Sequence, residues 1–300
     1  TYIYFEGANQ ETDLYVNGRH AGHHTGGYTR FCFDITELIR PGQPNVLAVK
    51  VDNKDNPDIP PLSADFTFFG GIYRDVYLIH TPAVHISTTD CASSGVYITT
   101  PEVSERNAEV NVRTLVDNRS GRKSRVRVEN TVYAPDGTRT VQASTRIEAD
   151  GGTTPVVQEK MAVPQPALWS PDAPNLYRVV TRLYDDRTGA LLDEVVNPLG
   201  LRWFEFSADK GFFLNGKHLK LIGTNRHQDY LGKGWALDDI VHVQDVRLLK
   251  AMGGNYLRVA HYPQDPVVME MCDKLGILTS VEIPVVDRIT ENAAFEKNCL

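Results

Sequence analysis

The first 80 residues show the period-two alternation that is typical of half-buried β-strands. Leu47, Val49 and Val51 lie at alternate positions of segment 45–51, on one face of a predicted strand. The dipeptide Asn17-Gly18 indicates a tight turn, because both residues accept a left-handed backbone. A proline-rich loop at 53–61 and a short strand at 72–79 follow. The pattern predicts an antiparallel β-sandwich that lacks part of its N-terminal edge.

From Val84 to about Asn197 the alternation continues with short strands at regular spacing. Two runs alternate most clearly: Val126, Val128, Asn130 and Val132, then Tyr177, Val179, Thr181 and Leu183. Pro135-Asp136-Gly137 indicates a turn, because Pro presets φ and Gly accepts a positive φ. A segment of this size predicts a second sandwich, similar to an immunoglobulin domain.

After Gly200 strands alternate with amphipathic helices. The predicted order is β-α-β-α-β, with strands at 218–222, 255–260 and 277–283 and helices that begin at Asp238 or Asp239 and at Asp265-Pro266. Gly253-Gly254 and Gly276 end the two helices. This order implies parallel strands, as at the start of a barrel or a doubly wound sheet.

These three regimes predict three domains, at 1–81, 82–199 and 200–300. The chain opens on the strand-like Thr1-Tyr2-Ile3-Tyr4-Phe5 without Met, so we expect it to be cut from a longer protein. The compartment stays open, and would be cytoplasmic or periplasmic in a bacterium.

Composition excludes several classes of protein. There are 38 acidic and 31 basic residues, a net charge of −7, and nucleic-acid binding normally needs a basic surplus instead. No run reaches the roughly 18 apolar residues of a membrane helix. Four scattered cysteines, with no CxxC pair, are interpreted as ordinary buried thiols. We therefore expect neither nucleic acid nor a membrane as a partner.

Polar side chains gather where the three predicted strands end, which is where parallel α/β folds carry their sites. The three stretches are 224–229, 258–262 and 282–287, and they supply arginine, histidine and carboxylates. This set suits a hydroxyl-rich or anionic ligand. The alternative is that these side chains only form hydrogen bonds with the loop backbone. Their recurrence at three successive strand ends favours a functional role instead.

Other chemistries find no support in the motifs. No Ser lies in a G-x-S-x-G elbow, and Gly232-Lys233-Gly234 lacks the spacing of a phosphate-binding loop. His20, His23 and His24 lie in a predicted turn and are interpreted as solvated residues rather than metal ligands.

Several phrases, in this order, resemble glycoside hydrolase family two. They are Leu14-Tyr15-Val16-Asn17-Gly18, Gly26-Gly27-Tyr28-Thr29-Arg30-Phe31, Gly70-Gly71-Ile72-Tyr73-Arg74-Asp75, Leu168-Trp169-Ser170-Pro171, Gly223-Thr224-Asn225-Arg226-His227-Gln228 and Arg258-Val259-Ala260-His261-Tyr262-Pro263. The resemblance implies a jelly roll, an immunoglobulin-like sandwich and the first three β/α strands of a truncated (β/α)8 TIM barrel. Within the family, the sequence is most similar to the β-galactosidases, and β-glucuronidases and β-mannosidases are the alternatives.

The resemblance implies a retaining exo-β-glycosidase that hydrolyses terminal β-D-galactosides or another β-linked glycan. Such an enzyme uses two carboxylates about 5 Å apart. In the family these glutamates belong to the fourth and seventh barrel strands, so we expect no catalytic residue among these 300 residues and an inactive chain. Homo-oligomerisation of the whole enzyme stays open.

The resemblance also implies substrate-binding residues. His227 and His261 match barrel histidines that face the sugar, Arg258 matches a rim arginine, and Asp65 matches a jelly-roll aspartate that contacts sugar hydroxyls. Some members hold a sodium ion beside that aspartate. The glutamate and histidine that bind magnesium in some members are replaced here by Val286 and Arg288, so we expect no metal site of that kind.

Two other classes compete. A carbohydrate-binding protein built from two sandwiches would not need the β-α-β-α-β segment. A nucleotide-binding α/β enzyme would need a glycine-rich turn that the sequence lacks.

Overall fold

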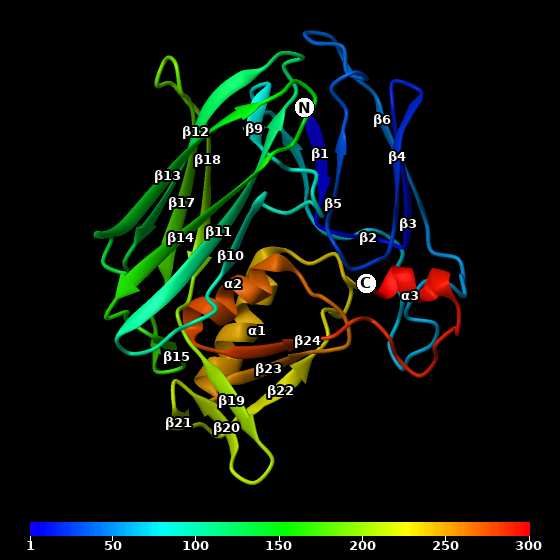
Figure 1. The fold of residues 1–300 in the computed structure, drawn as a ribbon. Coiled ribbons are helices and arrows are strands. Elements are labelled where there is room, and N and C mark those ends of the chain that lie inside the picture. The colour runs from blue at the N-terminus through cyan, green and yellow to red at the C-terminus, as the bar shows by residue number, and fades with distance from the viewer. The chain divides into compact units, whose positions relative to one another are not determined.

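A computed structural model describes all residues, 1–300, and contains two compact units. One unit comprises Thr1–Ile79, Ile222–Cys272 and Ile277–Leu300. The other comprises His80–Leu221 with Asp273–Gly276. The predicted fold class is confirmed: the chain contains a jelly-roll sandwich, an immunoglobulin-like sandwich and the first three β/α strands of a TIM barrel (Figure 1).

The jelly roll consists of short antiparallel strands. One sheet has the order β5-β1-β8, another β4-β3-β6, and β2 pairs with β7. The strands are β1 Tyr2–Phe5, β2 Ala8–Asn9, β3 Glu11–Val16, β4 Arg19–Thr25, β5 Phe31–Asp34, β6 Leu47–Asp52, β7 Gly71–Ile72 and β8 Val76–Ile79. Their apolar faces enclose a core of Ile3, Phe5, Ala8, Leu14, Val16, Phe31 and Ile35. The predicted turn joins β3 to β4, with φ values of 51° at Asn17 and 81° at Gly18.

The three histidines of the predicted turn lie in strand β4 instead. His20 and His23 each place a ring nitrogen 3.0 Å from Asp13 Oδ1. The His24 ring stacks on Phe31 with centroids 4.1 Å apart, so it is a packed residue and not a solvated one. Alternation along the strand explains the difference, because it turns His24 toward the core face while His23 points to solvent.

The immunoglobulin-like sandwich contains two four-stranded antiparallel sheets. One contains β9 Val84–Ile86, β10 Val96–Thr99, β11 Asn107–Asn118 and β14 Val156–Pro164; the other contains β12 Ser124–Tyr133, β13 Arg139–Ala149, β17 Tyr177–Asp185 and β18 Leu191–Leu199. Both predicted alternating runs point into the core between the sheets, which confirms the register inferred from the sequence. Each sheet thus buries one face, as the period-two pattern requires.

Small strands complete this unit: β15 Trp169–Ser170, β16 Ala173–Pro174, β19 Phe204–Ser207, β20 Gly211–Leu214 and β21 Lys217–His218. Trp169 is buried as a corner anchor, and its Nε1 donates to the Asp273 carbonyl at 2.9 Å. The strand predicted at 218–222 is wrong. His218 belongs to the antiparallel hairpin strand β21, and the first barrel strand begins at Gly223.

Three parallel strands and two helices form the start of the barrel. They are β22 Gly223–Arg226, α1 Asp239–Ala251, β23 Tyr256–Val259, α2 Pro266–Leu275 and β24 Leu278–Val281, followed by α3 Ala293–Cys299. The strand register explains the glycine at the start of β22: a Cβ on Gly223 would lie 1.7 Å from the Tyr256 carbonyl oxygen. Helices α1 and α2 cover the sheet (Figure 1).

The helix starts confirm most of the predicted capping. Asp265 Oδ1 accepts from the Val267 N–H at 3.0 Å, as an N-cap does. Asp238 precedes α1, but its carboxylate pairs with Lys233 Nζ at 2.6 Å instead of capping. Ile240 of α1 is exposed, and the helix buries His242, Val246 and Leu249.

Two further expectations concern cysteines and helices. Of the four cysteines, only Cys272 is buried and Cys91 is exposed, so the interpretation of all four as buried thiols is wrong. Cys91 has φ of 52° in a turn, which keeps its side chain outside the sandwich core. None of the helices has the length and apolar character that crossing a bilayer requires.

Candidate carbohydrate-binding site

Four polar side chains meet where the three parallel barrel strands end. His227 follows β22, Arg258 lies in β23, His261 follows β23, and Glu282 follows β24. Because parallel strands end at the same edge of a sheet, these residues converge. The rings of His227 and His261 meet edge to face with centroids 5.3 Å apart.

Arg258, His261 and Glu282 form one hydrogen-bonded group. Arg258 Nε donates to Glu282 Oε1, and His261 Nδ1 lies 2.8 Å from Glu282 Oε2. Arg258 Nη2 lies 3.2 Å from the same Nδ1. Burial would raise the pKa of Glu282, but the bonds from Arg258 and His261 outweigh burial and lower it. Glu282 is therefore ionised at neutral pH.

His227 lies beside this hydrogen-bonded group and contacts Tyr262. Its Nδ1 lies 3.3 Å from the Tyr262 hydroxyl, and Tyr262 itself is fully buried. Burial first, and then the nearby His261 and Arg258, lower the pKa of His227. A neutral imidazole has one donor and one acceptor nitrogen, which suits a sugar hydroxyl.

The loop between β6 and β7 brings the jelly roll to this rim. The Phe66 ring lies 5.0 Å from the His227 ring and 6.1 Å from the His261 ring, measured between centroids. Asp65, the residue before it, is exposed, and its charge acts to raise the pKa of His227. The four predicted residues therefore lie in one region, with Phe66 between the aspartate and the histidines.

Buried contacts hold the jelly roll and the barrel strands together within this unit. Tyr28, Tyr73, Trp235 and Tyr262 form one apolar cluster. The buried Arg74 donates to Gln228 Oε1 at 3.1 Å and to the Pro263 carbonyl at 2.7 Å. Gln228 directly follows His227 and Pro263 lies two residues after His261, so Arg74 fixes the chain beside both histidines.

A second network supports β22 from the helix side. Arg226 pairs with Asp245 at 2.8 Å, donates to Gln264 Oε1 at 2.7 Å, and lies 2.9 Å from His242 Nδ1. Gln264 in turn donates to the Ala260 carbonyl at 3.3 Å. The segment that carries His261 is therefore anchored to strand β22 and helix α1.

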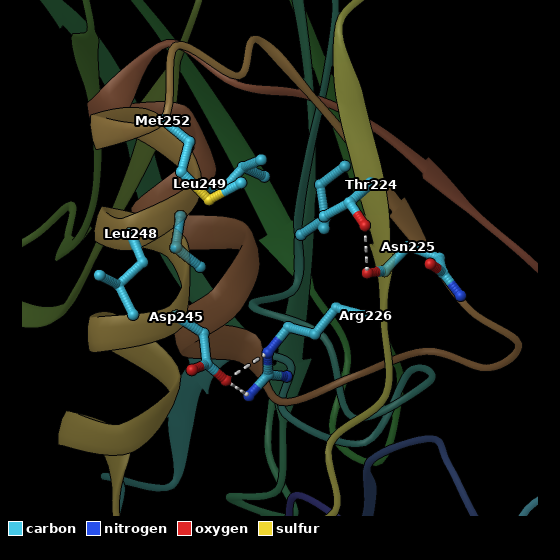
Figure 2. Close-up of a pocket in the computed structure, with 9 residues that line it drawn as sticks. Thr224, Asn225, Arg226, Asp245, Leu248, Leu249 and Met252 are labelled. Carbon is cyan, nitrogen blue, oxygen red and sulfur yellow. Dashed lines mark hydrogen bonds and ion pairs between the residues drawn. The ribbon is translucent and has the colours of Figure 1, made fainter.

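An apolar cavity of about 160 Å³ lies between β22 and α1 (Figure 2). Leu249 and Met252 point from the helix toward the strand, Thr224 lines the cavity from the strand, and Leu248 lies at its edge on the helix. Strand β22 is the edge of its sheet. The cavity contains none of the four rim residues, so we assign the site to the strand ends and not to this space.

A separate group of carboxylates contains Glu6 and Asp75 of the jelly roll and Asp239 and Asp265 of the barrel segment. Burial first, and then Asp265 and Asp75, raise the pKa of Glu6 to about 7. The same two aspartates, after burial, raise the pKa of Asp239. Asp265 is only 5% exposed. No three of these side chains come close enough together to enclose a metal ion by themselves.

Sequence reasoning assigned no role to three residues of the site. Glu282 was visible as a carboxylate at the third strand end, but only the structure shows that it binds Arg258 and His261. Phe66 follows Asp65 directly, yet an aromatic residue in a loop carries no signal of its destination. Tyr262 follows His261, is buried, and meets the His227 ring edge to face.

The fold combines two β-sandwiches with the start of a barrel, and the polar rim lies where the three parallel barrel strands end. The chain belongs to glycosyl hydrolases family 2. Residues 1–82 match the model of the family's sugar binding domain, and residues 207–297 match the model of its TIM barrel domain. Residues 85–202, between them, match the model that carries the name glycosyl hydrolases family 2 itself.

The curated relatives include enzymes of two specificities. A β-glucuronidase of Bacteroides fragilis is 40% identical over 95% of this chain, which covers 41% of that protein. A β-galactosidase of Thermoanaerobacter pseudethanolicus is 36% identical over 94% of this chain, which covers 37% of that protein. The chain thus spans about two fifths of the length of these relatives.

Two solved structures of Bacteroides uniformis β-glucuronidase 2 are also similar. One, covalently bound to cyclophellitol-6-carboxylate aziridine, has a TM-score of 0.96 and 43% identity. The other, a calcium binding mutant with two aspartates replaced by alanine, has a TM-score of 0.94 and 42% identity. In each case 99% of this chain and 36% of the other are covered.

Proposed function

We propose that this chain forms the sugar-recognising front of a retaining exo-β-glycosidase that removes terminal β-D-glucuronic acid. The observation that carries the proposal is the rim of His227, Arg258, His261 and Glu282 in a chain 43% identical to the Bacteroides uniformis enzyme. That enzyme is described in covalent complex with a sugar-like carboxylate. A covalent complex agrees with the retaining route, in which a carboxylate nucleophile forms a glycosyl-enzyme.

In this proposal the rim residues bind hydroxyl groups of the terminal sugar. His227 and His261 each offer a ring nitrogen, and Asp65 offers carboxylate oxygens that accept from hydroxyls. Arg258 supports His261. The two catalytic carboxylates are proposed to lie outside these 300 residues, because both carboxylate oxygens of Glu282 already accept hydrogen bonds, from Arg258 and His261.

The second candidate substrate is a terminal β-D-galactoside, the preference that the sequence predicted. The match to a β-galactosidase at 36% identity supports it. The rim does not choose between the two sugars, because the Arg258 guanidinium is already paired with Glu282 and is not a free cation for a glucuronide carboxylate. The glucuronide preference therefore rests on the relatives, and a β-mannoside is the remaining alternative within the family.

The test compares the nitrophenyl β-D-glucuronide, galactoside and mannoside as substrates of the enzyme that contains this chain. We expect the largest kcat/KM on the glucuronide. A larger kcat/KM on the galactoside would replace the first candidate by the second. Activity on none of the three would refute both.

We also propose that the chain binds calcium through Asp239 and Asp265. The aspartates replaced in the calcium binding mutant of the relative stand 26 positions apart. Asp239 and Asp265 are the only two aspartates of this chain with that spacing. The charge of Asp265 acts on Asp239, and both charges act on Glu6.

The donor chemistry of this group fits calcium. Calcium takes six to eight oxygen ligands from carboxylates, backbone carbonyls and water, so two aspartates need not enclose it alone. Burial first, and then repulsion from neighbouring carboxylates, raises the pKa values of Glu6 and Asp239, and a divalent cation would relieve the repulsion. An ion here would join Glu6 and Asp75 of the jelly roll to the starts of α1 and α2.

Calorimetric titration of the 300-residue chain with calcium tests this site. We expect binding that Asp239→Asn and Asp265→Asn weaken at least tenfold. Asparagine remains a good helix N-cap, so Asp265→Asn keeps the start of α2 intact. The matched control is Asp238→Asn, because Asp238 is adjacent but pairs with Lys233.

Thermal unfolding gives a second readout of the same site. Calcium at a hundred times its Kd would add about 2.7 kcal/mol to the free energy of unfolding. Calcium that neither binds nor stabilises the unmodified chain, or that binds all three variants equally, would refute the site. The glycosidase proposal would stand in either case.

A further inference from the structure

We propose that Glu282 is a positioning residue that fixes His261 with its proton on Nδ1, leaving Nε2 as the hydrogen-bond acceptor for a sugar hydroxyl. The inference rests on the proposed function only in assigning a sugar to His261. Glu282 itself is not proposed to contact the substrate.

The geometry around His261 Nδ1 admits one assignment. A carboxylate only accepts hydrogen bonds, so a bond to Glu282 requires a proton on Nδ1. A guanidinium only donates them, so a bond from Arg258 requires Nδ1 without a proton. The Glu282 oxygen is the nearer, at 2.8 Å against 3.2 Å for Arg258 Nη2. Nδ1 therefore carries the proton and donates to Glu282.

Arg258 holds the carboxylate for this task. Its Nε donates to Glu282 Oε1, while His261 occupies the other oxygen. Both oxygens of Glu282 are thus used, and the side chain is only 28% exposed. A carboxylate held at both oxygens cannot rotate away from the imidazole without breaking two charge-assisted bonds.

The ring plane of His261 is restricted as well. Phe66 packs against it with an interplanar angle of 26°, and the His227 ring meets its edge at 70°. With the ring held on both sides and Nδ1 bonded, Nε2 is the nitrogen left for a ligand. This is the arrangement in which an outer carboxylate sets the tautomer of a ligand-binding histidine.

The tautomer can be read directly from the 300-residue chain. Nitrogen NMR of histidine-labelled protein near pH 8.5, where an ordinary imidazole is neutral, distinguishes a proton on Nδ1 from one on Nε2. His261→Asn assigns the signal. We expect the Nδ1–H form in the unmodified chain and a shift toward Nε2–H in Glu282→Gln, because the amide can also donate to Nδ1. A proton on Nε2 in the unmodified chain would overturn the proposal.

Kinetics of the enzyme that contains this chain test the consequence. Glu282→Gln should lower kcat/KM about 10–100-fold, the range found when the orienting partner of a histidine is removed. The same change in a His261→Asn background should cost less than twofold, since Glu282 acts through His261. Glu291→Gln is the control, because that carboxylate is exposed and lies outside the 282–287 stretch of the rim.

Additive losses in the double variant would overturn the proposal, because they would mean that Glu282 acts on substrate or fold independently of His261. Failure of the proposed function would look different. It would remove activity on every glycoside but leave the NMR result unchanged.

Discussion

Tyr28 of the jelly roll stacks on Tyr262 of the barrel segment, with ring centroids 4.6 Å apart and an interplanar angle of 20°. Both rings are buried, and the Tyr262 hydroxyl reaches His227. This pair therefore connects the packing of the jelly roll to a residue of the proposed sugar site.

We expect Tyr28→Ala to lower the free energy of unfolding by about 3–5 kcal/mol, as for other buried aromatic residues. Tyr28→Phe is the matched control, because the Tyr28 hydroxyl is buried without a hydrogen-bond partner and its removal should cost little. Chemical denaturation of both variants measures the difference. Equal stabilities would mean that the stacked rings do not hold the two parts together.

The sandwich cores were predictable because their signal is local. In β12 and β17 every second residue faces the core, and the sequence shows that alternation directly. The first barrel strand was misplaced because the apolar residues lie within 218–222, whereas strand β22, Gly223–Arg226, contains no large apolar residue. Gly223 allows a close approach to β23, and Arg226 takes part in a hydrogen-bond network. Tertiary packing, not alternation, decides that strand.

The site was partly predictable for a similar reason. Parallel strand ends converge by topology, so His227, Arg258 and His261 were expected to meet. The roles of Phe66 and Glu282 were not predicted, because they depend on a loop path and on a side-chain bond across strands. Neither the loop path nor the side-chain bond produces a periodic pattern in the sequence.

His261→Ala in the enzyme that contains this chain should lower kcat/KM. A preorganised hydrogen-bonding ring that serves the transition state contributes about 2–4 kcal/mol. Nitrophenyl glycosides measure the loss, and thermal unfolding checks that the fold survives. An unchanged kcat/KM would reduce His261 to a packing residue beside Phe66.

Asp65→Ala should raise KM without unfolding the jelly roll. The Asp65 side chain is exposed in the loop before β7, so its truncation opens no cavity. We expect equal melting temperatures and a weaker dependence of rate on sugar identity. A large fall in melting temperature with an intact KM would instead identify Asp65 as a structural residue of its loop. The sodium ion that the resemblance places beside Asp65 stays a prediction.

Acid should destabilise the jelly roll through His24. Burial against Phe31 first, and then the neighbouring His23, lower the pKa of His24 from 6.5 to about 4. The folded state therefore binds the proton more weakly than the unfolded state, and stability is lost as the pH falls from 6.5 to 4.

His24→Phe preserves the stacked ring and removes the titration, so its melting temperature should fall less over this range. His20→Phe is the control, because His20 is exposed and pairs with Asp13. Identical pH profiles for the unmodified chain and His24→Phe would contradict the assignment.

The 300-residue chain by itself should hydrolyse no glycoside. Retaining cleavage needs a nucleophilic carboxylate and a second carboxyl group that begins as an acid, about 5 Å apart across the bond. Glu282 does not suit the acid role, because Arg258 and His261 lower its pKa and hold both of its oxygens. Asp229 and Asp287 are exposed at the rim, where water weakens the electrostatic stabilisation of a developing cation. The measurement is incubation of the purified chain with nitrophenyl β-D-glucuronide, galactoside and mannoside. Turnover that Glu282→Gln abolishes, and that Asp287→Asn leaves unchanged, would show that Glu282 is a catalytic carboxylate and would overturn its assignment as a positioning residue.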